Sequence, residues 1–304
     1  MNRWIEAARP RTLPLAIASI LLGNFLAYAA GKFSFLTATL AILTTLLLQI
    51  LSNFANDLGD SKNGVDNKNR KVALRAVQTG KISPSEMKNA VIITASLSFI
   101  SGISLLFFAL QYAKPQTIIT FVMLGLLAIL AAIAYTVGKK PYGYIGLGDL
   151  SVFLFFGWVG TFGTYYLQTE ILNYYILIPA SGCGFLSVAV LNLNNLRDHE
   201  NDKQSKKNTL VVSMGFEKAK YYHGFLIILG LSFWFVSVLV ISALTYNILL
   251  FVALIPSISL IFHLKRVFQT SEPKDLDPEL KKVALITFFS SLIFALVINL
   301  IKPN

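Results

Sequence analysis

The sequence has few of the side chains that soluble enzymes use for metal binding and nucleophilic chemistry. Among its 304 residues there are three histidines and one cysteine, Cys183, so an intrachain disulfide and a cysteine-based metal site are excluded. We expect Cys183 to be a small apolar core residue. No glycine-rich phosphate loop of the GxxxxGKS or GxGxxG type is present. Charged residues make up only 13% of the chain, against 55% apolar residues, which is typical of a membrane protein.

Long apolar runs dominate the chain instead. A helix needs about 20 residues to cross the roughly 30 Å hydrocarbon core of a bilayer. The runs predict nine transmembrane helices, near residues 13–30, 35–56, 89–110, 117–137, 148–167, 173–194, 222–244, 247–263 and 283–301. We therefore predict an all-α, polytopic membrane protein with a single domain over residues 1–304. The opening MNRWIEAARPRTLPLA has no compact apolar region with a small-residue cleavage site, so we expect no cleaved signal peptide.

The charges of this chain are distributed unequally between the two sides of the predicted membrane topology. The net charge is +11. With nine helices and a cytoplasmic N-terminus, all Lys and Arg residues except Lys32, Lys114 and Lys302 fall in cytoplasmic segments. We therefore expect a multi-pass protein of the inner (cytoplasmic) membrane. The basic loops have no separate domain on which to bind nucleic acid, so we expect no nucleic-acid partner.

Two clusters of carboxylates and amides stand at the ends of the second and sixth predicted helices. The first is NFANDLGD at residues 53–60, and the second is NLNNLRDHEND at residues 192–202. Each is followed by a basic loop and then by a glycine that opens the next helix, in TGKISPSEMK and SMGFEKAK. This similarity predicts two related halves, about 1–145 and 146–304. Both clusters lie on the cytoplasmic side of the predicted topology, where they can face each other across one cavity.

Within each cluster the spacing predicts a ladder of oxygen ligands on one helix face. The ladders are Asn53, Asp57 and Asp60 in the first half, and Asn194, Asp198 and Asp202 in the second. Carboxylates at membrane depth are costly and are functional by default. Carboxylate and amide oxygens suit Mg²⁺, which is commonly completed by substrate phosphates. The alternative interpretation is a helix cap or a solvated loop residue, which we prefer for Asp66, Asn67 and Asn69.

A polyphosphate held by such cations must be part of a molecule that can reach a cavity in the membrane. A soluble nucleotide is one candidate, although its usual glycine-rich loops are missing. A lipid diphosphate fits better, because its tail would lie among the apolar helices while its head group meets the cations. The sequence therefore favours a lipid diphosphate as substrate.

These motifs resemble those of the UbiA superfamily of intramembrane prenyltransferases, which carries two Asp-rich motifs near NxxxDxxxD. The chain is most similar to the branch of 1,4-dihydroxy-2-naphthoate polyprenyltransferases. The similar segments are ARPRTLP (8–14), QILSNFANDLGD (49–60), the LR before a QxG (74–80), GLGD (146–149) and NNLRDHEND. The resemblance runs from residue 8 to about residue 215, and the residues beyond are apolar and not diagnostic.

Two positions depart from the family pattern. Ser61 stands where a strict first motif has its last aspartate, so Asp60 must serve. After the second motif, Asn208 stands where the family usually has a basic residue, and Lys206 and Lys207 are the nearest replacements. The residues that contact the diphosphate are therefore less well defined than the metal ligands.

The resemblance implies Mg²⁺-dependent transfer of a polyprenyl group from its allylic diphosphate to 1,4-dihydroxy-2-naphthoate. The acceptor would lose its carboxylate and give demethylmenaquinol, for menaquinone biosynthesis. Phytyl transfer toward phylloquinone, or another aromatic acceptor such as 4-hydroxybenzoate, is the alternative within the superfamily. A cation-coupled secondary transporter is a distant alternative. Transporter sites lie near the membrane midplane, whereas these ladders lie at the predicted cytoplasmic ends of helices. The expected partners are these two substrates and the lipid bilayer. We infer no obligate protein partner.

Several side chains are candidates for roles in this reaction. The two ladders would bind Mg²⁺ and act in catalysis. Substrate-binding candidates are Arg197, Lys139, Lys140, Arg75 and Asp149. Lys139 and Lys140 are equally well explained as topology charges, and Asp149 as a helix cap. His199 is a candidate base but is better explained as an exposed loop residue, while His223 and His263 are isolated in the sequence.

Overall fold

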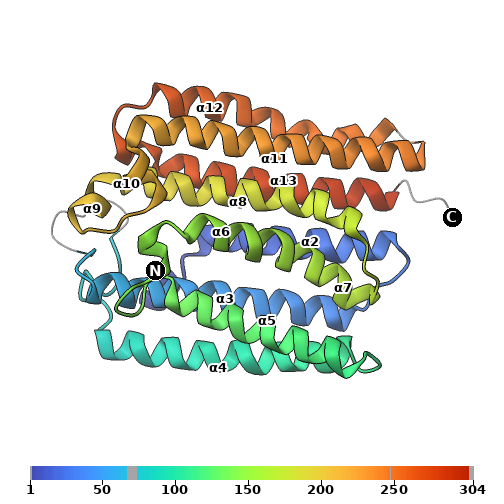
Figure 1. Ribbon diagram of the computed structural model, residues 1–304, viewed down its shortest axis with the longest axis horizontal. Helices are drawn as coiled ribbons and strands as arrows, with labels where there is room; N and C mark the ends of the chain where they lie inside the picture. The colour runs from blue at the N-terminus through green and yellow to red at the C-terminus, as the bar shows by residue number, and fades with distance from the viewer. Residues whose placement is uncertain (1, 67–73, 247, 301–304) are drawn as a thin grey trace.

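The computed structural model describes residues 2–66, 74–246 and 248–300, and the regular structure in these ranges is helical (Figure 1). Nine segments of the described chain are long and apolar enough to cross a membrane, so the predicted number is confirmed there. They are Arg3–Ala29, Phe35–Lys62, Pro84–Ala109, Pro115–Ala134, Gly148–Thr169, Tyr174–Arg197, Phe216–Ala243, Ile248–Gln269 and Pro273–Leu300. Asn67 and Asn69 lie outside the described residues. Cys183 is buried in the core, as predicted.

The segments are built from α-helices and shorter 3₁₀ and π segments. The α-helices are α1 (Arg3–Ala8), α2 (Leu13–Ala29), α3 (Phe35–Lys62), α4 (Pro84–Ala109), α5 (Pro115–Ala134), α6 (Gly148–Val152), α7 (Thr164–Thr169), α8 (Leu177–Arg197), α9 (His199–Gln204), α10 (Leu210–Met214), α11 (Phe216–Thr245), α12 (Ser259–Gln269) and α13 (Asp277–Leu300). The 3₁₀ segments are η1 (Pro10–Thr12), η2 (Tyr142–Ile145), η4 (Tyr174–Ile176), η5 (Ile248–Ile258) and η6 (Pro273–Leu276), and Phe153–Gly163 is a π-helix.

The two helices that carry the polar clusters end at the same end of the bundle. In Figure 1 the N-terminus, α9 and α10 lie at this end, and the C-terminus lies at the opposite end. Helix α3 continues to Lys62, beyond the predicted end near residue 56, so the first ladder lies inside the helix. Helix α8 ends at Arg197, and α9 begins directly after Asp198.

A glycine with positive φ precedes the next membrane helix after each polar cluster. Gly80 has φ of 72° and Gly215 has φ of 81°, values that a residue with a Cβ rarely adopts. Gly215 is the N-cap residue of α11. Helix α4 instead starts with a capping box, in which Ser83 and Glu86 each accept a hydrogen bond from the backbone N–H of the other. Each of these positions before a membrane helix therefore favours glycine.

The fifth membrane segment packs unusually close to its neighbours. A Cβ added at Gly157 would lie 2.8 Å from the carbonyl oxygen of Ala180 on α8, and one added at Gly160 would lie 2.6 Å from Oγ of Ser19 on α2. Small residues allow such close helix contacts in membranes. The eleven-residue π-helix is therefore held between α2 and α8, and π segments are frequent at functional sites.

Candidate active site

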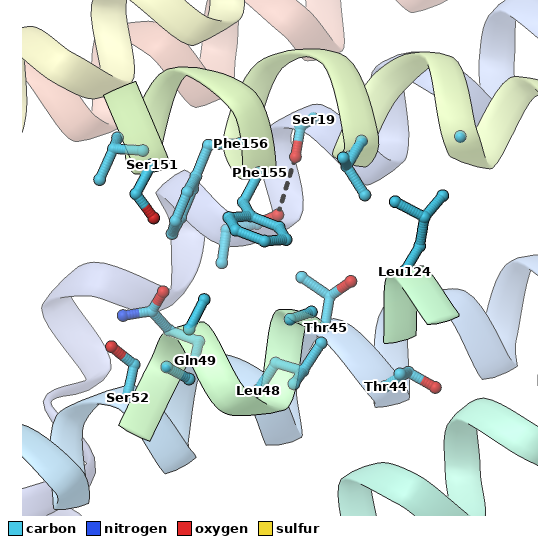
Figure 2. A pocket seen from close by; sticks show the side chains of 18 of the residues that line it. Ser19, Thr44, Thr45, Leu48, Gln49, Ser52, Leu124, Ser151, Phe155 and Phe156 are labelled. Atoms are coloured by element: carbon cyan, nitrogen blue, oxygen red, sulfur yellow. Dashed lines mark hydrogen bonds between the residues drawn. The ribbon is translucent and has the colours of Figure 1, made fainter. Parts of the chain in front are cut away.

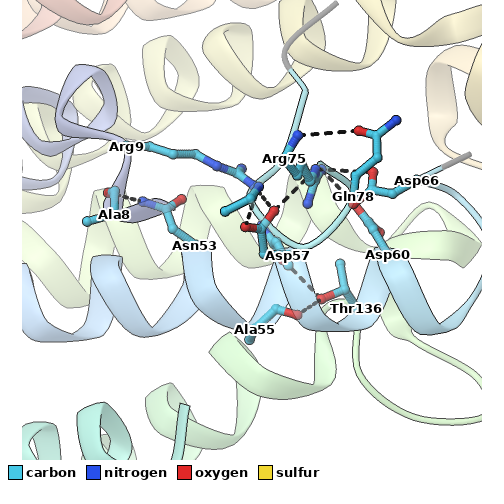
Figure 3. A network of polar contacts seen from close by, with 12 residues as sticks. Ala8, Arg9, Asn53, Ala55, Asp57, Asp60, Asp66, Arg75, Gln78 and Thr136 are labelled. Atoms are coloured by element: carbon cyan, nitrogen blue, oxygen red, sulfur yellow. Dashed lines mark hydrogen bonds and ion pairs between the residues drawn. The ribbon is translucent and has the colours of Figure 1, made fainter. Parts of the chain in front are cut away.

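The first ladder lies in the last three turns of α3 and is buried (Figure 3). Nδ2 of Asn53 donates a hydrogen bond to the carbonyl oxygen of Ala8 at 2.8 Å. Oδ2 of Asp57 accepts from the backbone N–H of Ala76 at 3.2 Å, and its Oδ1 lies 3.6 Å from Nη2 of Arg9. The N-terminal segment and the loop after the cluster therefore both pack on this ladder.

Arg75 is the main cation among the carboxylates of the first half. Its Nη2 lies 2.6 Å from Oδ2 of Asp60, and its Nε lies 3.4 Å from Oδ1 of Asp66 and 4.0 Å from Oδ1 of Asp57 (Figure 3). Burial alone would lower the pKa of Arg75, but the carboxylates of these three aspartates raise it, so the guanidinium stays charged. The prediction that Asp66 is a cap or solvated residue is wrong: its side chain is buried because it pairs with Arg75.

The second ladder is held by a guanidinium from its own motif. Arg197 donates from Nε to Oδ1 of Asp198 at 2.7 Å and from Nη2 to Oδ2 at 2.8 Å. Nη2 also donates to Oδ1 of Asn194 at 2.9 Å, and Nη1 donates to Oδ1 of Asp277 at 2.7 Å. Arg197 is buried and does not line the cavity described below. A contact between Arg197 and a diphosphate therefore stays a prediction.

One lysine joins the two ladders. Nζ of Lys207 lies 3.7 Å from Oδ1 of Asp202 and 3.9 Å from Oδ2 of Asp60. The same ammonium lies 5.3 Å from the ring centre of Tyr144, whose hydroxyl donates to Oδ1 of Asp60. Carboxylates separated by more than a hundred positions in the sequence are thus brought to one place, as the predicted topology with both clusters on one side allowed. Lys207, one of the two replacements considered for the missing basic residue, is the cation between them.

A cavity of about 910 Å³ connects this polar site with the apolar interior. Its polar end is lined by Arg9, Asn53, Asp60, Arg75, Asn194 and Lys207. Farther along, the π-helix directs Phe155 and Phe156 toward Leu48 and Gln49 of α3 (Figure 2). The lining continues to Tyr174, at the end of the sixth membrane segment away from the ladders. The cavity can therefore hold a long apolar chain whose polar head lies beside Asp60 and the basic side chains, whereas Asp57, Asp198 and Asp202 do not line it.

Comparison with known proteins gives the family. The model of the UbiA prenyltransferase family matches residues 16–298. The chain belongs to this family. It is 44% identical over 298 residues to 1,4-dihydroxy-2-naphthoate octaprenyltransferase of Haemophilus influenzae, with 97% of this chain and 95% of the relative covered. It is 50% identical over 224 residues to the protein of the same name from Escherichia coli, with 74% and 72% covered. Family membership favours an enzyme over the secondary transporter.

Solved structures of UbiA homologues share the fold of this family member. A homologue from Archaeoglobus fulgidus bound to GPP and Mg²⁺ superposes with a TM-score of 0.66 at 17% identity, covering 99% of both chains. The apo structure of a homologue from Aeropyrum pernix K1 gives 0.68 at 12% identity, covering 94% of this chain and 98% of that one. The bundle of membrane helices is therefore the family fold.

The donor set fits Mg²⁺ completed by a substrate. Within the described residues, no group of three or more His, Cys, Asp and Glu side chains could hold a metal ion by itself. The buried oxygens Oδ1 of Asp57 and Oδ1 of Asn195 accept no hydrogen bond. Mg²⁺ usually takes one or two carboxylates and completes its shell with water and substrate phosphates, so an open set of oxygen donors suits it. That Asn53, Asp57, Asp60, Asn194, Asp198 and Asp202 would hold it stays a prediction of the sequence.

Like Arg197, three further predicted substrate contacts lie outside the cavity lining. Lys139 and Lys140 are exposed, as expected for topology charges. Asp149 lies in the first turn of α6, but the N-cap residue is Leu147 and no side chain caps this helix, so the cap interpretation is wrong. Instead Oδ2 of Asp149 accepts a hydrogen bond from the hydroxyl of Tyr222 at 2.9 Å, which links α6 to α11. Contacts of these residues with substrate stay predictions.

The histidines are placed differently from what the sequence indicated. His223 and His263 are isolated in the sequence but meet in the fold, with their Nε2 atoms 2.8 Å apart. Nδ1 of His263 lies 2.7 Å from Oε2 of Glu279, so this buried group connects α11, α12 and α13. His199 is partly buried beside the ring of Phe216 rather than exposed. Its pKa is lowered by burial and by a nearby lysine.

Sequence reasoning missed two side chains of the site. Arg9 lines the cavity and lies beside Asp57, and Tyr144 donates to Asp60. A signal for Arg9 was present, because it belongs to the ARPRTLP segment that resembles the family. Tyr144 lies two positions before the GLGD segment but has no charge or spacing that would distinguish it from other aromatics.

Proposed function

We propose that this chain transfers a polyprenyl group, octaprenyl as in its named relatives, from the diphosphate to 1,4-dihydroxy-2-naphthoate. The product would be demethylmenaquinol, a precursor in menaquinone biosynthesis. The observation that carries the proposal is a cavity that reaches Asn53 and Asp60 of the first ladder and Asn194 of the second, and continues into an apolar interior. The near full-length similarity to 1,4-dihydroxy-2-naphthoate octaprenyltransferases supports the choice of acceptor.

We further propose that the ladders face the cytoplasm and that residues 1–304 form one domain with related halves, about 1–145 and 146–304. The positive-inside rule supports this orientation, because the basic loops follow the polar clusters. The N-terminus lies at the same end of the bundle as these loops (Figure 1). A water-soluble acceptor made in the cytoplasm would then reach the site directly.

The polar residues bind and orient the diphosphate. Mg²⁺ held by Asp57, Asp60, Asp198 and Asp202 would neutralise the charge that develops on the leaving pyrophosphate. Asn53 and Asn194 would orient these carboxylates or complete the ligand set. Nη1 of Arg75 is buried in the cavity wall and donates no hydrogen bond. A guanidinium in this state can donate to a phosphate oxygen, which makes Arg75 a candidate diphosphate contact, as are Arg9 and Lys207 in the same lining.

The apolar wall protects the allylic cation after the diphosphate leaves. Phe155, Phe156 and Trp158 on the π-helix line the cavity beside aliphatic side chains of α3 and α5. Ring faces attract a cation, and an apolar wall excludes the water that would otherwise capture it. The π-helix therefore serves the chemistry by supplying several aromatic side chains to one wall.

Loss of the acceptor's carboxylate removes the need for a strong base. The ring carbon that bears the carboxylate attacks the allylic cation, and the C–C bond to the carboxylate then breaks. Its electron pair restores the aromatic ring as carbon dioxide leaves. No histidine lines the cavity within the described residues. An acceptor that loses carbon dioxide instead of a proton suits a cavity whose described lining contains no histidine to act as the base.

The test is to incubate the purified protein with 1,4-dihydroxy-2-naphthoate, Mg²⁺ and prenyl diphosphates of several lengths, and to identify the products by mass. We expect prenylated, decarboxylated product with octaprenyl diphosphate. Product only from phytyl diphosphate, or only with 4-hydroxybenzoate as acceptor, would replace this proposal with the corresponding alternative in the family.

A further inference from the structure

Two uncharged polar side chains face the cavity beside the first ladder. Gln49 lies on α3, one helical turn before Asn53, and Ser151 lies on α6. Both line the cavity, and they point into it from opposite walls next to Phe155 and Phe156 (Figure 2). Neither belongs to the ladders or to the cationic side chains, so the reaction proposed above has given them no part.

The hydrogen bonds around Gln49 determine which end of its amide faces the cavity. Oγ1 of Thr12 donates its only proton to the carbonyl oxygen of Arg9 at 2.9 Å, so it can only accept from other side chains. Nε2 of Gln49 donates to this oxygen at 3.3 Å and reaches Oδ1 of Asn53 at 3.5 Å. The other end of the amide, Oε1, is left for the cavity (Figure 2). A molecule bound at Oε1 would therefore lie next to the first ladder.

Ser151 is also limited to accepting hydrogen bonds. The hydroxyl of Tyr142 donates its proton to the carbonyl oxygen of Ala131 at 2.9 Å. The 3.0 Å contact between this hydroxyl and Oγ of Ser151 must therefore use the proton of Ser151. Oγ of Ser151 keeps a lone pair but has no proton left for a ligand. Toward a molecule in the cavity, Oγ of Ser151 and Oε1 of Gln49 are thus both acceptors.

The chemistry of the two substrates decides which of them meets these oxygens. An ionised prenyl diphosphate has oxygen acceptors and no donor, so its head group suits the cations of the lining, such as Arg75 and Lys207. 1,4-Dihydroxy-2-naphthoate has two hydroxyl donors at opposite, para positions of one ring. Two acceptors on opposite walls suit two hydroxyls placed in this way. The rings of Phe155 and Phe156 can pack against the flat naphthalene.

We propose that Gln49 and Ser151 determine the specificity for the acceptor: each accepts a hydrogen bond from one of the two hydroxyls of 1,4-dihydroxy-2-naphthoate. The inference rests on the function proposed above. 4-Hydroxybenzoate, an alternative acceptor in the superfamily, has one hydroxyl, and the group para to it is a carboxylate. A carboxylate has no proton to donate and would place its charge against the second protein oxygen, which disfavours this compound. The pair therefore selects a ring with two hydroxyls.

The experiment compares Gln49→Met and Ser151→Ala with the control Thr45→Val, which removes a hydroxyl from the cavity lining one turn farther from the ladder. Binding of 1,4-dihydroxy-2-naphthoate and of 1-hydroxy-2-naphthoate, which lacks the 4-hydroxyl, is measured by equilibrium dialysis without diphosphate and without oxygen. We expect the unsubstituted protein to bind the dihydroxy compound about tenfold more tightly, which corresponds to about 1.4 kcal/mol.

The two variants should divide this preference between them. The variant that has lost the partner of the 4-hydroxyl should bind both compounds equally, because the hydroxyl that distinguishes them no longer has a partner. The other variant should bind both compounds more weakly and keep the preference. Thr45→Val should match the unsubstituted protein. The KM for prenyl diphosphate, measured in parallel, reports on the neighbouring Asn53 and should not change.

A preference for the dihydroxy compound that both variants keep in full would overturn the inference, as would an equal effect of Thr45→Val. A raised KM for prenyl diphosphate with unchanged acceptor binding would also overturn it, because the two side chains would then support the ladder rather than the acceptor. Acceptor binding with the expected pattern, but no prenylated product from any diphosphate, would refute the proposed function alone.

Discussion

Replacement of Arg75 by glutamine should make the stability of the protein depend on Mg²⁺. The guanidinium of Arg75 is buried among carboxylates, 2.6 Å from Asp60 and 3.4 Å from Asp66. Removing one partner of a buried ion pair destabilises a protein by about 3–5 kcal/mol. For a chain of this size 1 kcal/mol corresponds to about 2 °C in melting temperature, so the variant should melt roughly 6–10 °C lower in EDTA. Millimolar Mg²⁺ should restore much of this difference, because the cation would take the place of the guanidinium.

The assay is thermal unfolding in detergent at one scan rate, with EDTA or with Mg²⁺, because membrane proteins often unfold irreversibly. Arg3→Gln is a matched control. It breaks an ion pair of 2.9 Å with Glu86, but both side chains are more than 40% exposed. Exposed pairs contribute about 1 kcal/mol or less, so this variant should melt within about 2 °C of the unsubstituted protein in both buffers. If Mg²⁺ stabilises Arg75→Gln no more than the unsubstituted protein, the cation does not bind where Arg75 lies, and the reasoning fails.

The other predictions concern metal dependence and orientation. Asp57→Ala and Asp198→Ala should each reduce turnover at least a thousandfold at saturating Mg²⁺, because each removes charge stabilisation worth about 4 kcal/mol or more. Both variants should still elute as folded proteins. Near-normal turnover in either variant would contradict a shared site. EDTA should abolish turnover of the unsubstituted protein, and added Mg²⁺ should restore it. A cysteine at Lys114 should react with an impermeant thiol reagent from the periplasmic side and one at Lys203 should not, with little background because Cys183 is buried; the reverse pattern would place the ladders on the periplasmic side.

The number of membrane helices and the position of the ladders could be predicted from local features of the sequence. Hydropathy depends on runs of about 20 residues, and the i, i+4 spacing of Asn53 and Asp57 needs only a single helix. Both features survive in the fold, with α3 extended through the motif. The family resemblance also rests on short motifs that can be read without knowing the fold.

What the sequence could not reveal is contact between distant segments. Arg197 and Asp277 are 80 positions apart, and Arg11 and Asp277 are 266 positions apart, with no pattern linking them. For the same reason His223 and His263 were read as isolated although they meet in the core. The π-helix was also missed, because hydropathy measures how apolar a segment is and not which hydrogen-bond register its backbone takes.

The most direct test of the account uses acceptor labelled in its carboxylate. The purified protein is incubated with octaprenyl diphosphate, Mg²⁺ and carboxyl-labelled 1,4-dihydroxy-2-naphthoate, and label released as carbon dioxide is compared with prenylated product. The account predicts one labelled carbon dioxide for each prenyl group transferred, and no release when EDTA is present. Prenylated product that retains the label would contradict it, because attack would then occur at another ring carbon and require a base, and no histidine lines the cavity in the described part of the chain.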